Sequence, residues 1–261
     1  MAKNTKENID NRRKELLAYV ARNPSVTIDE LFDKFDTSSV TIRRDINQLL
    51  SENLIKKNLN GEFTLNHDPA FDVNYFKRYS MHHLEKVLIA KKAIELVQSG
   101  HVLGIDSSTT ALELAKQLIS KEGITVITNS LFIPHYLTLH SSLTLFCVGG
   151  QVNMNNVSTE GFTSCQEISN YNYDISFFSA DALHFETGLS NYDVGSINTT
   201  LAFLKNSAKK VLLLDSSKIQ TKASRKFLPL SDIDLVITDS GISEVQTEEF
   251  SRLNIPLEIA F

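Results

Sequence analysis

The sequence is poor in cysteine, proline and glycine. It holds 2 Cys, 5 Pro and 10 Gly among 261 residues. So few glycines argue against an architecture that depends on several glycine-rich phosphate-binding loops. Cys147 and Cys165 lie 18 positions apart with no C-x-x-C spacing, so neither a disulfide framework nor a cysteine zinc site is indicated. A reducing cytoplasm fits this cysteine usage best.

Signals for export, membrane insertion and metal binding are also missing. The first 15 residues are polar and lack the apolar segment of a signal peptide. The apolar run at 211–214 is cut off by Lys210 and Asp215, far short of the roughly 18 residues that span a bilayer. The 7 histidines show no metal-ligand spacing, because His82 and His83 are adjacent and the others are scattered. We therefore expect a cytoplasmic protein with no membrane partner, no metal and no cofactor.

What remains is the composition of a folded globular chain with unequal halves. Hydrophobic residues make up 42% and charged residues 22% of a length that suits one large or two ordinary domains. Residues 1–66 carry 11 Lys and Arg against 10 Asp and Glu, whereas residues 67–261 carry 15 against 21. The net charge thus changes sign along the chain, which suggests that the two halves meet different partners.

The first 66 residues have the pattern of a winged helix. Helical spacing of apolar residues predicts helices over Glu7–Ala21 and Ile28–Phe35, with Thr27 and Glu30 as a capping box. A third helix follows Ser38, with its buried stripe formed by Ile42, Ile46, Leu49 and Leu50. Two short strand-like runs, Leu54–Lys57 and Phe63–Leu65, flank Asn60-Gly61, a strong hairpin signal.

The polar face of the third helix predicts a reader of the DNA major groove. An arginine can bond guanine through two hydrogen bonds, and serine or threonine can reach phosphates and base edges. The candidate DNA-binding residues are Ser38, Ser39, Thr41, Arg43 and Arg44, with Lys56 and Lys57 in the wing. Arg12 and Arg13 are candidates for further backbone contacts, which weaken with salt. The alternatives are an ordinary solvated helix face and a protein-interaction module.

Beyond residue 66 the pattern changes twice. Residues 67–84 show no clear strand periodicity and form a linker that is helical at its end. Residues 85–261 alternate apolar strands with amphipathic helices, which predicts a mostly parallel α/β domain. The expected strands are 101–105, 125–128, 143–148, 174–180, 210–214, 235–238 and 257–261. The expected helices are 87–98, 110–120, 131–139, 164–170, 197–208 and 244–253.

Polar clusters follow four of these strands. Because ligands of open α/β sheets bind at the carboxyl ends of the strands, the clusters predict a lined binding site there. Hydroxyls and free N–H groups at a helix N-terminus suit a phosphate, with a lysine as its partner. The candidate effector-binding residues are Asp106, Ser107, Ser108, Thr109, Thr110, Asn129, Gly150 and Lys218. Ordinary helix capping by serine or threonine is the alternative at the first cluster.

The same edge admits a catalytic interpretation. Asp106, Asp181 or Asp215 could act as a general base, and Lys218 could stabilise developing charge. Nothing in the spacing requires this chemistry, and no G-x-S-x-G, P-loop or G-x-G-x-x-G motif occurs. We therefore assign no catalytic residue and expect a non-enzyme, with a sugar-phosphate isomerase or hydrolase carrying an accessory winged domain as the alternative.

Taken together, two sets of motifs resemble the DeoR family of bacterial transcriptional regulators. The run from Ser38 to Ile46 contains T-I-R-R-D, and downstream come D-S-S-T-T at 106–110, T-N-S at 128–130, G-G at 149–150 and D-S-S-K at 215–218. The resemblance covers about residues 7–240. It implies a winged helix-turn-helix, residues 1–66, that reads an operator, a linker, 67–84, and an α/β domain, 85–261, similar in fold to ribose-5-phosphate isomerase. It also implies a homodimer or homotetramer that represses a sugar uptake or catabolism operon under control of a phosphorylated sugar.

Three departures from the family pattern bear on the effector and the wing. Ser108 stands where the family usually has glycine, and the wing lacks the usual basic residue followed by H-G-G-A. Ser196, Ile197 and Thr200 replace a Glu-Ala pair and a basic residue, which leaves one charged pair fewer at the predicted effector site. The missing acidic residue near Ser196 also argues against an isomerase, because proton transfer needs a well-placed base.

Overall fold

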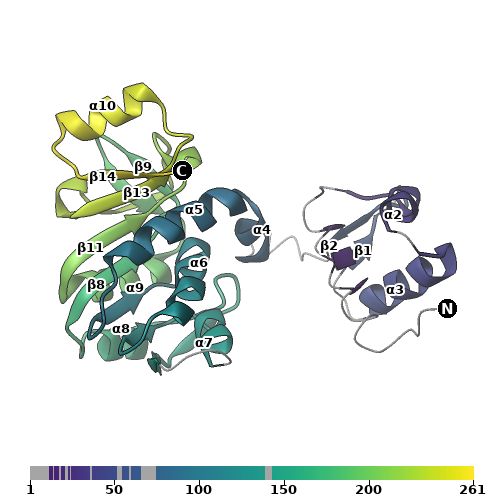
Figure 1. Cartoon of the computed structure of the whole chain (residues 1–261), viewed down its shortest axis with the longest axis horizontal. Coiled ribbons are helices and arrows are strands. Elements are labelled where there is room, and N and C mark those ends of the chain that lie inside the picture. Colours follow the sequence, from purple (N-terminus) through teal and green to yellow (C-terminus); the bar gives the residue numbers. More distant parts are fainter. Residues whose placement is uncertain are drawn as a thin grey trace. The chain divides into compact units, whose positions relative to one another are not determined.

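The structure is a computed structural model that describes residues 12, 13, 15–17, 19, 20, 23, 25–35, 37–51, 55–58, 60–65, 75–138 and 143–261. The chain divides into two compact units, Met1–Met81 and His82–Phe261 (Figure 1). Each unit has its own hydrophobic core, so each is considered by itself.

The N-terminal unit is a winged helix. Residues 12, 13, 15–17, 19 and 20 are helical, while the other residues of the predicted first helix lie outside the described ones. Helix α2 (Ile28–Lys34) begins at the predicted capping box: Glu30 N–H donates to Thr27 Oγ1 at 3.3 Å, and Thr27 N–H donates to Glu30 Oε2 at 2.8 Å. Helix α3 (Ser39–Ser51) buries Ile42, Ile46 and Leu49, as its apolar stripe predicts. Strands β1 (Ile55–Lys57) and β2 (Phe63–Leu65) pair antiparallel to form the wing.

Seven parallel strands form the sheet of the C-terminal unit, and all seven were predicted. Their order is β14-β13-β11-β8-β3-β4-β5, and every neighbouring pair is parallel. The strands are β3 (Val102–Ile105), β4 (Thr125–Thr128), β5 (Thr144–Cys147), β8 (Tyr173–Phe178), β11 (Ser207–Leu213), β13 (Leu235–Asp239) and β14 (Leu257–Ala260). The inner strands β3, β4, β8 and β13 were readable because a strand buried on both faces is nearly continuously apolar, whereas the edge strands β5 and β14 are more exposed.

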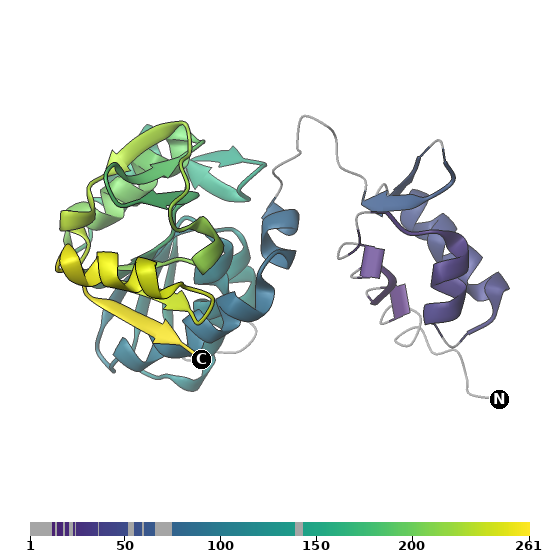
Figure 2. The same ribbon diagram turned by 90° about the horizontal axis from the view of Figure 1, so that it is seen from above.

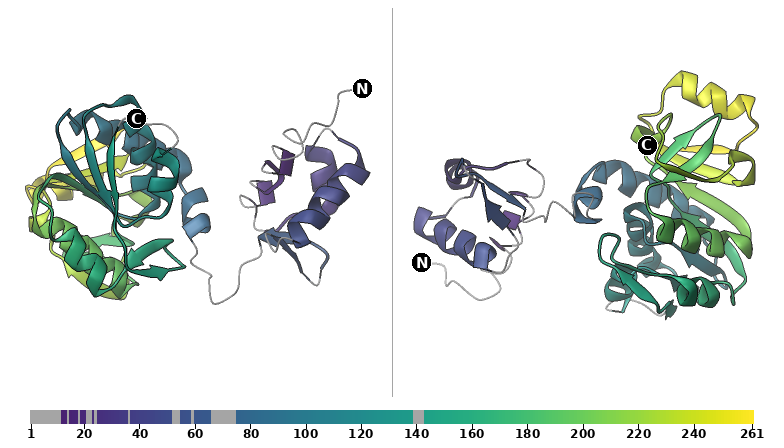
Figure 3. Two further views of the ribbon diagram at one scale, coloured as in Figure 1. Left: turned by 90° about the horizontal axis from the view of Figure 1, so that it is seen from below. Right: turned by 180° about the vertical axis from the view of Figure 1, so that it is seen from behind.

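Helices cover both faces of this sheet. They are α5 (His83–Ala93), α6 (Thr109–Gln117), α7 (Phe132–Leu137), α8 (Phe162–Ile168), α9 (Val194–Lys205) and α10 (Glu244–Arg252). Helices α5 and α6 lie in front of the sheet in Figure 1, and α9 lies in front in the view from behind in Figure 3. Short 3₁₀ turns follow at Ile94–Leu96 (η2), Leu118–Ser120 (η3), Ser216–Lys218 (η4) and Leu230–Asp232 (η5). The predicted linker holds α4 (Tyr75–Ser80) and the first residues of α5.

The strand order reverses direction between β3 and β8. From β3 the chain proceeds through β4 to β5, then returns to β8 on the other side of β3 and continues through β11 and β13 to β14. Figure 2 shows β14 and α10 at the end of this progression. Open α/β sheets bind ligands outside the carboxyl ends of the strands at such a switch point. The fold therefore directs attention to the residues that follow β3 and β8.

Five short strands escaped prediction and form two small antiparallel sheets. One contains β6 (Gln151–Asn153) and β7 (Ser158–Glu160), a hairpin that projects from the unit (Figure 3). The other has the order β12-β10-β9, made of Arg225–Leu228, Gly188–Asn191 and Ala182–His184. Among the described residues no helix is long and apolar enough to cross a bilayer.

Candidate functional site

The N-terminus of α3 is closed by two of the predicted DNA-binding side chains. Thr41 N–H donates to Ser38 Oγ at 3.3 Å, and the hydroxyls of Ser38 and Thr41 lie 2.8 Å apart. Ser38 is exposed, whereas Thr41 is partly buried. Both hydroxyls therefore have a capping role in the free protein, as expected of serine before a helix.

Asp45 fixes α3 against the first helix. Its carboxylate is 1% exposed and accepts from Arg12 Nε at 2.6 Å and from Arg13 Nε at 3.0 Å. Arg12 and Arg13 were candidates for DNA backbone contacts, but their Nε atoms face Asp45 instead. A buried carboxylate needs such partners, because an unpaired buried charge is strongly unfavourable. The aspartate of T-I-R-R-D is thus a positioning residue of this helix.

The outward face of α3 carries the remaining candidates. Ser39, Arg43 and Arg44 are all exposed. The Arg43 guanidinium carbon lies 5.4 Å from the centroid of the Phe32 ring, a cation–π contact that holds this side chain over α2. A basic face built on a helix packed against two others has the geometry needed to enter a major groove.

The wing presents two lysines on β1. Lys56 and Lys57 are exposed, and Lys57 Nζ lies 5.7 Å from the centroid of the Phe63 ring. Asn58 organises the loop, since its Oδ1 accepts from the N–H groups of Asn60 and Glu62 at 2.9 and 3.0 Å. Its Nδ2 donates to Glu62 Oε2 at 2.7 Å. The wing tip therefore carries a carboxylate, and among the described residues of the wing the positive charge comes from Lys56 and Lys57.

At the switch point, Asp106 joins two strands. It directly follows β3, and its carboxylate accepts from Ser108 N–H and from Ser179 N–H, each at 2.9 Å. Ser179 directly follows β8. Burial raises the pKa of Asp106, while these hydrogen bonds and the charge of Lys218 act in the opposite direction. Asp106 thus connects the backbone segments that follow β3 and β8, in addition to lying at the carboxyl edge of the sheet.

The Asp106–Thr110 segment leads directly into α6. Ser108 Oγ accepts from Ala111 N–H at 3.2 Å and caps the helix. Thr109 and Thr110 are buried in its first turn, whereas Ser107 and Ser108 are partly exposed. The capping function proposed as the alternative is therefore present at Ser108. Free N–H groups at a helix N-terminus remain suited to an anion.

Lys218 brings a positive charge to the same edge. It lies on η4 after β11, donates from Nζ to Ala180 O at 3.0 Å, and is 3.8 Å from Asp215 Oδ2. Asp215 is 1% exposed. The lysine therefore contacts Ala180 in the segment after β8, next to Ser179, which donates a hydrogen bond to Asp106.

Besides Asp215 Oδ2, which faces Lys218 Nζ at 3.8 Å, the buried side chains of Asn129 and Ser179 at this edge each have a polar atom without a hydrogen-bond partner. Asn129 is 1% exposed, and although its Nδ2 donates to Thr159 O at 3.0 Å, its Oδ1 is unpartnered. Ser179 is 6% exposed, and its Oγ is also unpartnered. Since Ile105 pairs with Thr128, Asn129 follows its strand beside Asp106. Buried polar atoms are normally satisfied, so these two have capacity to bind a ligand.

Gly150 has a structural reason to be glycine. Its φ is 151°, and a Cβ there would lie 1.9 Å from Ser164 Oγ and 2.8 Å from Glu160 O. Ser164 Oγ in turn donates to Gly149 O at 2.7 Å. Gly150 thus allows the chain after β5 to pass closely over α8.

Sequence reasoning missed a polar cluster beside Ser196. Ser196 Oγ donates to Asp193 Oδ2 at 2.9 Å, lies 3.4 Å from Glu160 Oε1, and accepts from Asn156 Nδ2 at 2.8 Å. Burial and the charge of Asp193 raise the pKa of Glu160, against the hydrogen bond from Asn153. These residues come from two separate segments, the β6–β7 hairpin and the start of α9. The one available signal was the acidic residue inside S-T-E-G at 158–161.

This cluster corrects one argument made from the sequence. The expectation that no acidic residue lies near Ser196 is wrong, because Glu160 and Asp193 both contact it. The replacement of Glu by Ser196 therefore does not by itself argue against an enzyme. Thr200, where the family has a basic residue, is 4% exposed. Among the described residues, no group of three or more His, Cys, Asp and Glu is arranged to hold a metal ion.

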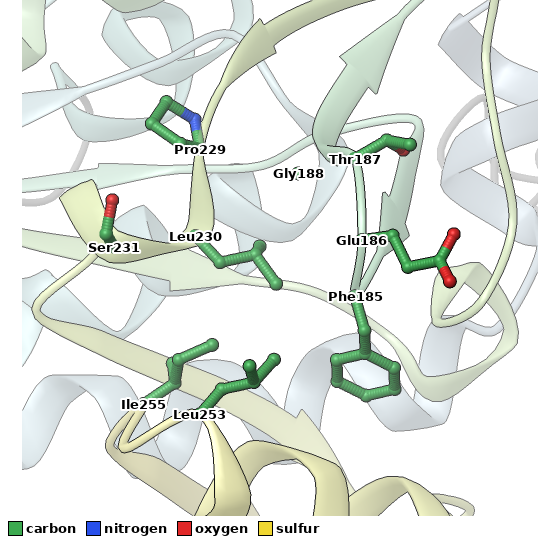
Figure 4. A pocket seen from close by; sticks show the side chains of 9 residues that line it. All are labelled: Phe185, Glu186, Thr187, Gly188, Pro229, Leu230, Ser231, Leu253 and Ile255. Atoms are coloured by element: carbon green, nitrogen blue, oxygen red, sulfur yellow. The ribbon is translucent and has the colours of Figure 1, made fainter.

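A cavity of about 300 Å³ lies elsewhere in this unit (Figure 4). It is lined by the β9–β10 turn, η5 and the end of α10, with Phe185, Leu230, Leu253 and Ile255 as its apolar walls. Glu186 and Ser231 provide polar groups to the lining. None of the predicted effector residues lines it.

Comparison with known proteins decides the family. Residues 12–67 match the family described as the DeoR-like helix-turn-helix domain, and residues 81–240 match the DeoR C terminal sensor domain. The chain belongs to the DeoR family. It is a DNA-binding transcriptional regulator of the helix-turn-helix class, which confirms the resemblance seen in T-I-R-R-D and the strand-end motifs.

Curated relatives agree with this membership in the DeoR family. An HTH-type transcriptional regulator of Haemophilus influenzae is 30% identical, over 94% of this chain and 95% of its own length. The lactose phosphotransferase system repressor of Lactococcus lactis is also 30% identical, over 92% and 95%. Ribose 5-phosphate isomerase A of Methanocaldococcus jannaschii is 21% identical, covering 53% of this chain and 55% of its own, at a TM-score of 0.40.

Proposed function

We propose that this regulator represses a sugar uptake or catabolism operon and is controlled by a phosphorylated sugar. In this proposal residues 1–66 bind operator DNA through α3 and the wing, and residues 85–261 bind the effector. Residues 67–84 are the linker that connects these two domains. The protein acts in the cytoplasm as a homodimer or homotetramer. The relative from Lactococcus lactis, named as the repressor of a lactose phosphotransferase system, supports this direction.

One observation carries the effector site. The unpartnered Asn129 Oδ1 and Ser179 Oγ follow strands on either side of β3, at the switch point of the sheet. Lys218 and the N-terminus of α6 belong to the same edge and would hold a phosphate, while the buried polar atoms would accept or donate hydrogen bonds to sugar hydroxyls. Ser107, Thr109, Thr110 and Gly150 are proposed as its further lining.

The effector controls DNA binding only if it binds the operator-competent and operator-free states with different free energies. A coupling of about 1–3 kcal/mol changes affinity about 5- to 150-fold. The test is a titration of operator-region DNA with the full chain, at two salt concentrations, with and without a panel of sugar phosphates. Release or tightening by one compound supports the proposal, and indifference to every compound contradicts the effector site.

The enzyme alternative has its own discriminating measurement. Glu160 and Asp193 supply carboxylates, so turnover of pentose and hexose phosphates by the full chain is followed spectrophotometrically. We expect no turnover above that of a Glu160→Gln, Asp193→Asn double variant. Turnover that the double variant loses would favour an isomerase.

A further inference from the structure

We propose that Val40 reads the methyl group of a thymine in the operator. The inference rests on the proposed operator binding and adds an apolar specificity contact to it. Val40 is 75% exposed, although it lies on a helix whose other large apolar residues are buried or partly buried. Among the described residues before Tyr75, no other large hydrophobic side chain is exposed.

The position of Val40 on α3 supports this role. At 100° per residue, Val40 lies about 180° from Leu49 and about 160° from Ile42, so it faces directly away from the core. Asn47 lies about 20° and Arg44 about 40° from it on the same side. Val40 is therefore at the centre of the outward face, one residue after Ser39.

The neighbouring side chains determine the kind of partner. The residues that share this face are polar or cationic, and the described part of the face has no acidic group: Asp45 points to the core, where Arg12 and Arg13 bind it. Two exposed arginines beside one apolar group match a DNA groove, where phosphates surround base edges. There the thymine C5-methyl is the apolar feature of the major groove, and aliphatic side chains contact it.

The capping of α3 strengthens the case for Val40 over Thr41. The hydroxyls of Ser38 and Thr41 lie 2.8 Å apart and close the helix, so reading a base with Thr41 would disturb the cap. Val40 has no such function in the fold. Its replacement by alanine removes contact area without removing a hydrogen bond, and alanine is the better helix former.

The test uses the full chain and a duplex that it selects from a randomised pool. Each thymine of that duplex is replaced in turn by deoxyuridine, which removes only the methyl group. We expect wild type to lose about fourfold in affinity at one thymine per half-site, as for the loss of one buried methyl group. Val40→Ala should lose a similar factor on the thymine duplex and nothing further on the uracil duplex.

Val245→Ala is the matched control, because Val245 on α10 is 70% exposed and belongs to the other unit. It should behave as wild type on every duplex. The inference would be overturned if replacing each thymine by uracil reduced the affinity of wild type and of Val40→Ala by the same factor. It would also be overturned if no thymine replacement changed the affinity of wild type. Either result would leave operator binding intact. A pool from which no sequence is enriched would overturn operator binding itself.

Discussion

Arg44 is the exposed cation of α3 best placed to contact a base. Arg43 is held over the Phe32 ring, whereas Arg44 shares its side of the helix with Val40 and Asn47. We expect Arg44→Ala to weaken binding to a selected operator by roughly 5- to 150-fold, because one bidentate arginine–guanine contact contributes about 1–3 kcal/mol of binding free energy. Arg252→Ala, at an exposed arginine of α10, is the control. Unchanged affinity in a gel-shift titration at fixed salt would count against α3 as the reader.

Asp45 contributes to the same function indirectly, by holding the helix. Removing its carboxylate leaves two guanidinium groups, 17% and 24% exposed, without their partner. We expect Asp45→Ala to destabilise the N-terminal unit by about 3 kcal/mol, a cost typical of breaking a buried ion pair. Hydrogen exchange measured by mass spectrometry reads the two units separately and should show faster exchange only before residue 66. Asp33→Ala, at an exposed position of α2, should leave exchange unchanged.

The turn after β5 depends on a glycine at one of two adjacent positions. A Cβ at Gly150 meets Ser164 Oγ and Glu160 O, whereas a Cβ at Gly149 meets nothing within 4 Å. We expect Gly150→Ala to cost about 1–3 kcal/mol through overpacking and strain. For a unit of this size that lowers Tm by roughly 2–4 °C per kcal/mol. Gly149→Ala is the control in the same calorimetric scan, and equal effects of the two changes would contradict the close approach.

The loops and hairpin around α9 give the C-terminal unit a pH dependence. Burial raises the pKa of Glu160 above its ordinary value of 4.5. Between these two pKa values the folded state therefore keeps a proton on Glu160 that the unfolded state has released. Stability then falls as pH rises from about 4.5 through the folded pKa. We expect the Tm of wild type to fall relative to that of Glu160→Gln over this range. Glu248→Gln, at an exposed glutamate of α10, is the control, and a constant offset between wild type and Glu160→Gln would contradict the shift.

These elements also show how far the sequence could be read. The seven strands of the parallel sheet were predictable because each lies in an apolar run between turn signals. The β6–β7 hairpin was not, because its strands are three residues long and largely polar. The strand-end motifs could be found one by one, since each is continuous in sequence. The Glu160–Asp193–Ser196 cluster could not, because only the packing of β7 against α9 brings its members together.

The whole molecule combines a nearly neutral DNA-binding half with an acidic C-terminal half. Residues 1–66 have almost balanced charge, and residues 67–261 have an acidic excess. We therefore expect long-range attraction to DNA to be weak, so that affinity depends on the proposed local contacts of α3 and the wing and on pairing of two half-sites by the proposed oligomer.

The proposed control by a sugar phosphate has to be reciprocal in its effect on the two binding affinities. A compound that weakens operator binding by a given factor must itself bind the operator complex more weakly by the same factor. Isothermal titration of that compound into the free protein and into the complex measures the second factor, and gel shifts measure the first. Unequal factors would show that the compound acts through a different equilibrium.

A variant of Lys218 can distinguish the affinity for sugar phosphate from the coupling between sugar-phosphate binding and operator binding. Because it is the cation at the predicted phosphate site, Lys218→Gln should weaken sugar-phosphate binding by roughly 10- to 150-fold, as for a hydrogen bond to a charged group. At saturating sugar phosphate, the variant should still release operator by the wild-type factor, since that factor depends on the two states and not on the affinity of one contact. Lys222→Gln, at an exposed lysine nearby in sequence, is the control. If Lys218→Gln binds the effector with unchanged affinity, the phosphate does not bind at η4. If the factor by which saturating sugar phosphate weakens operator binding changes in this variant, Lys218 takes part in the conformational coupling itself.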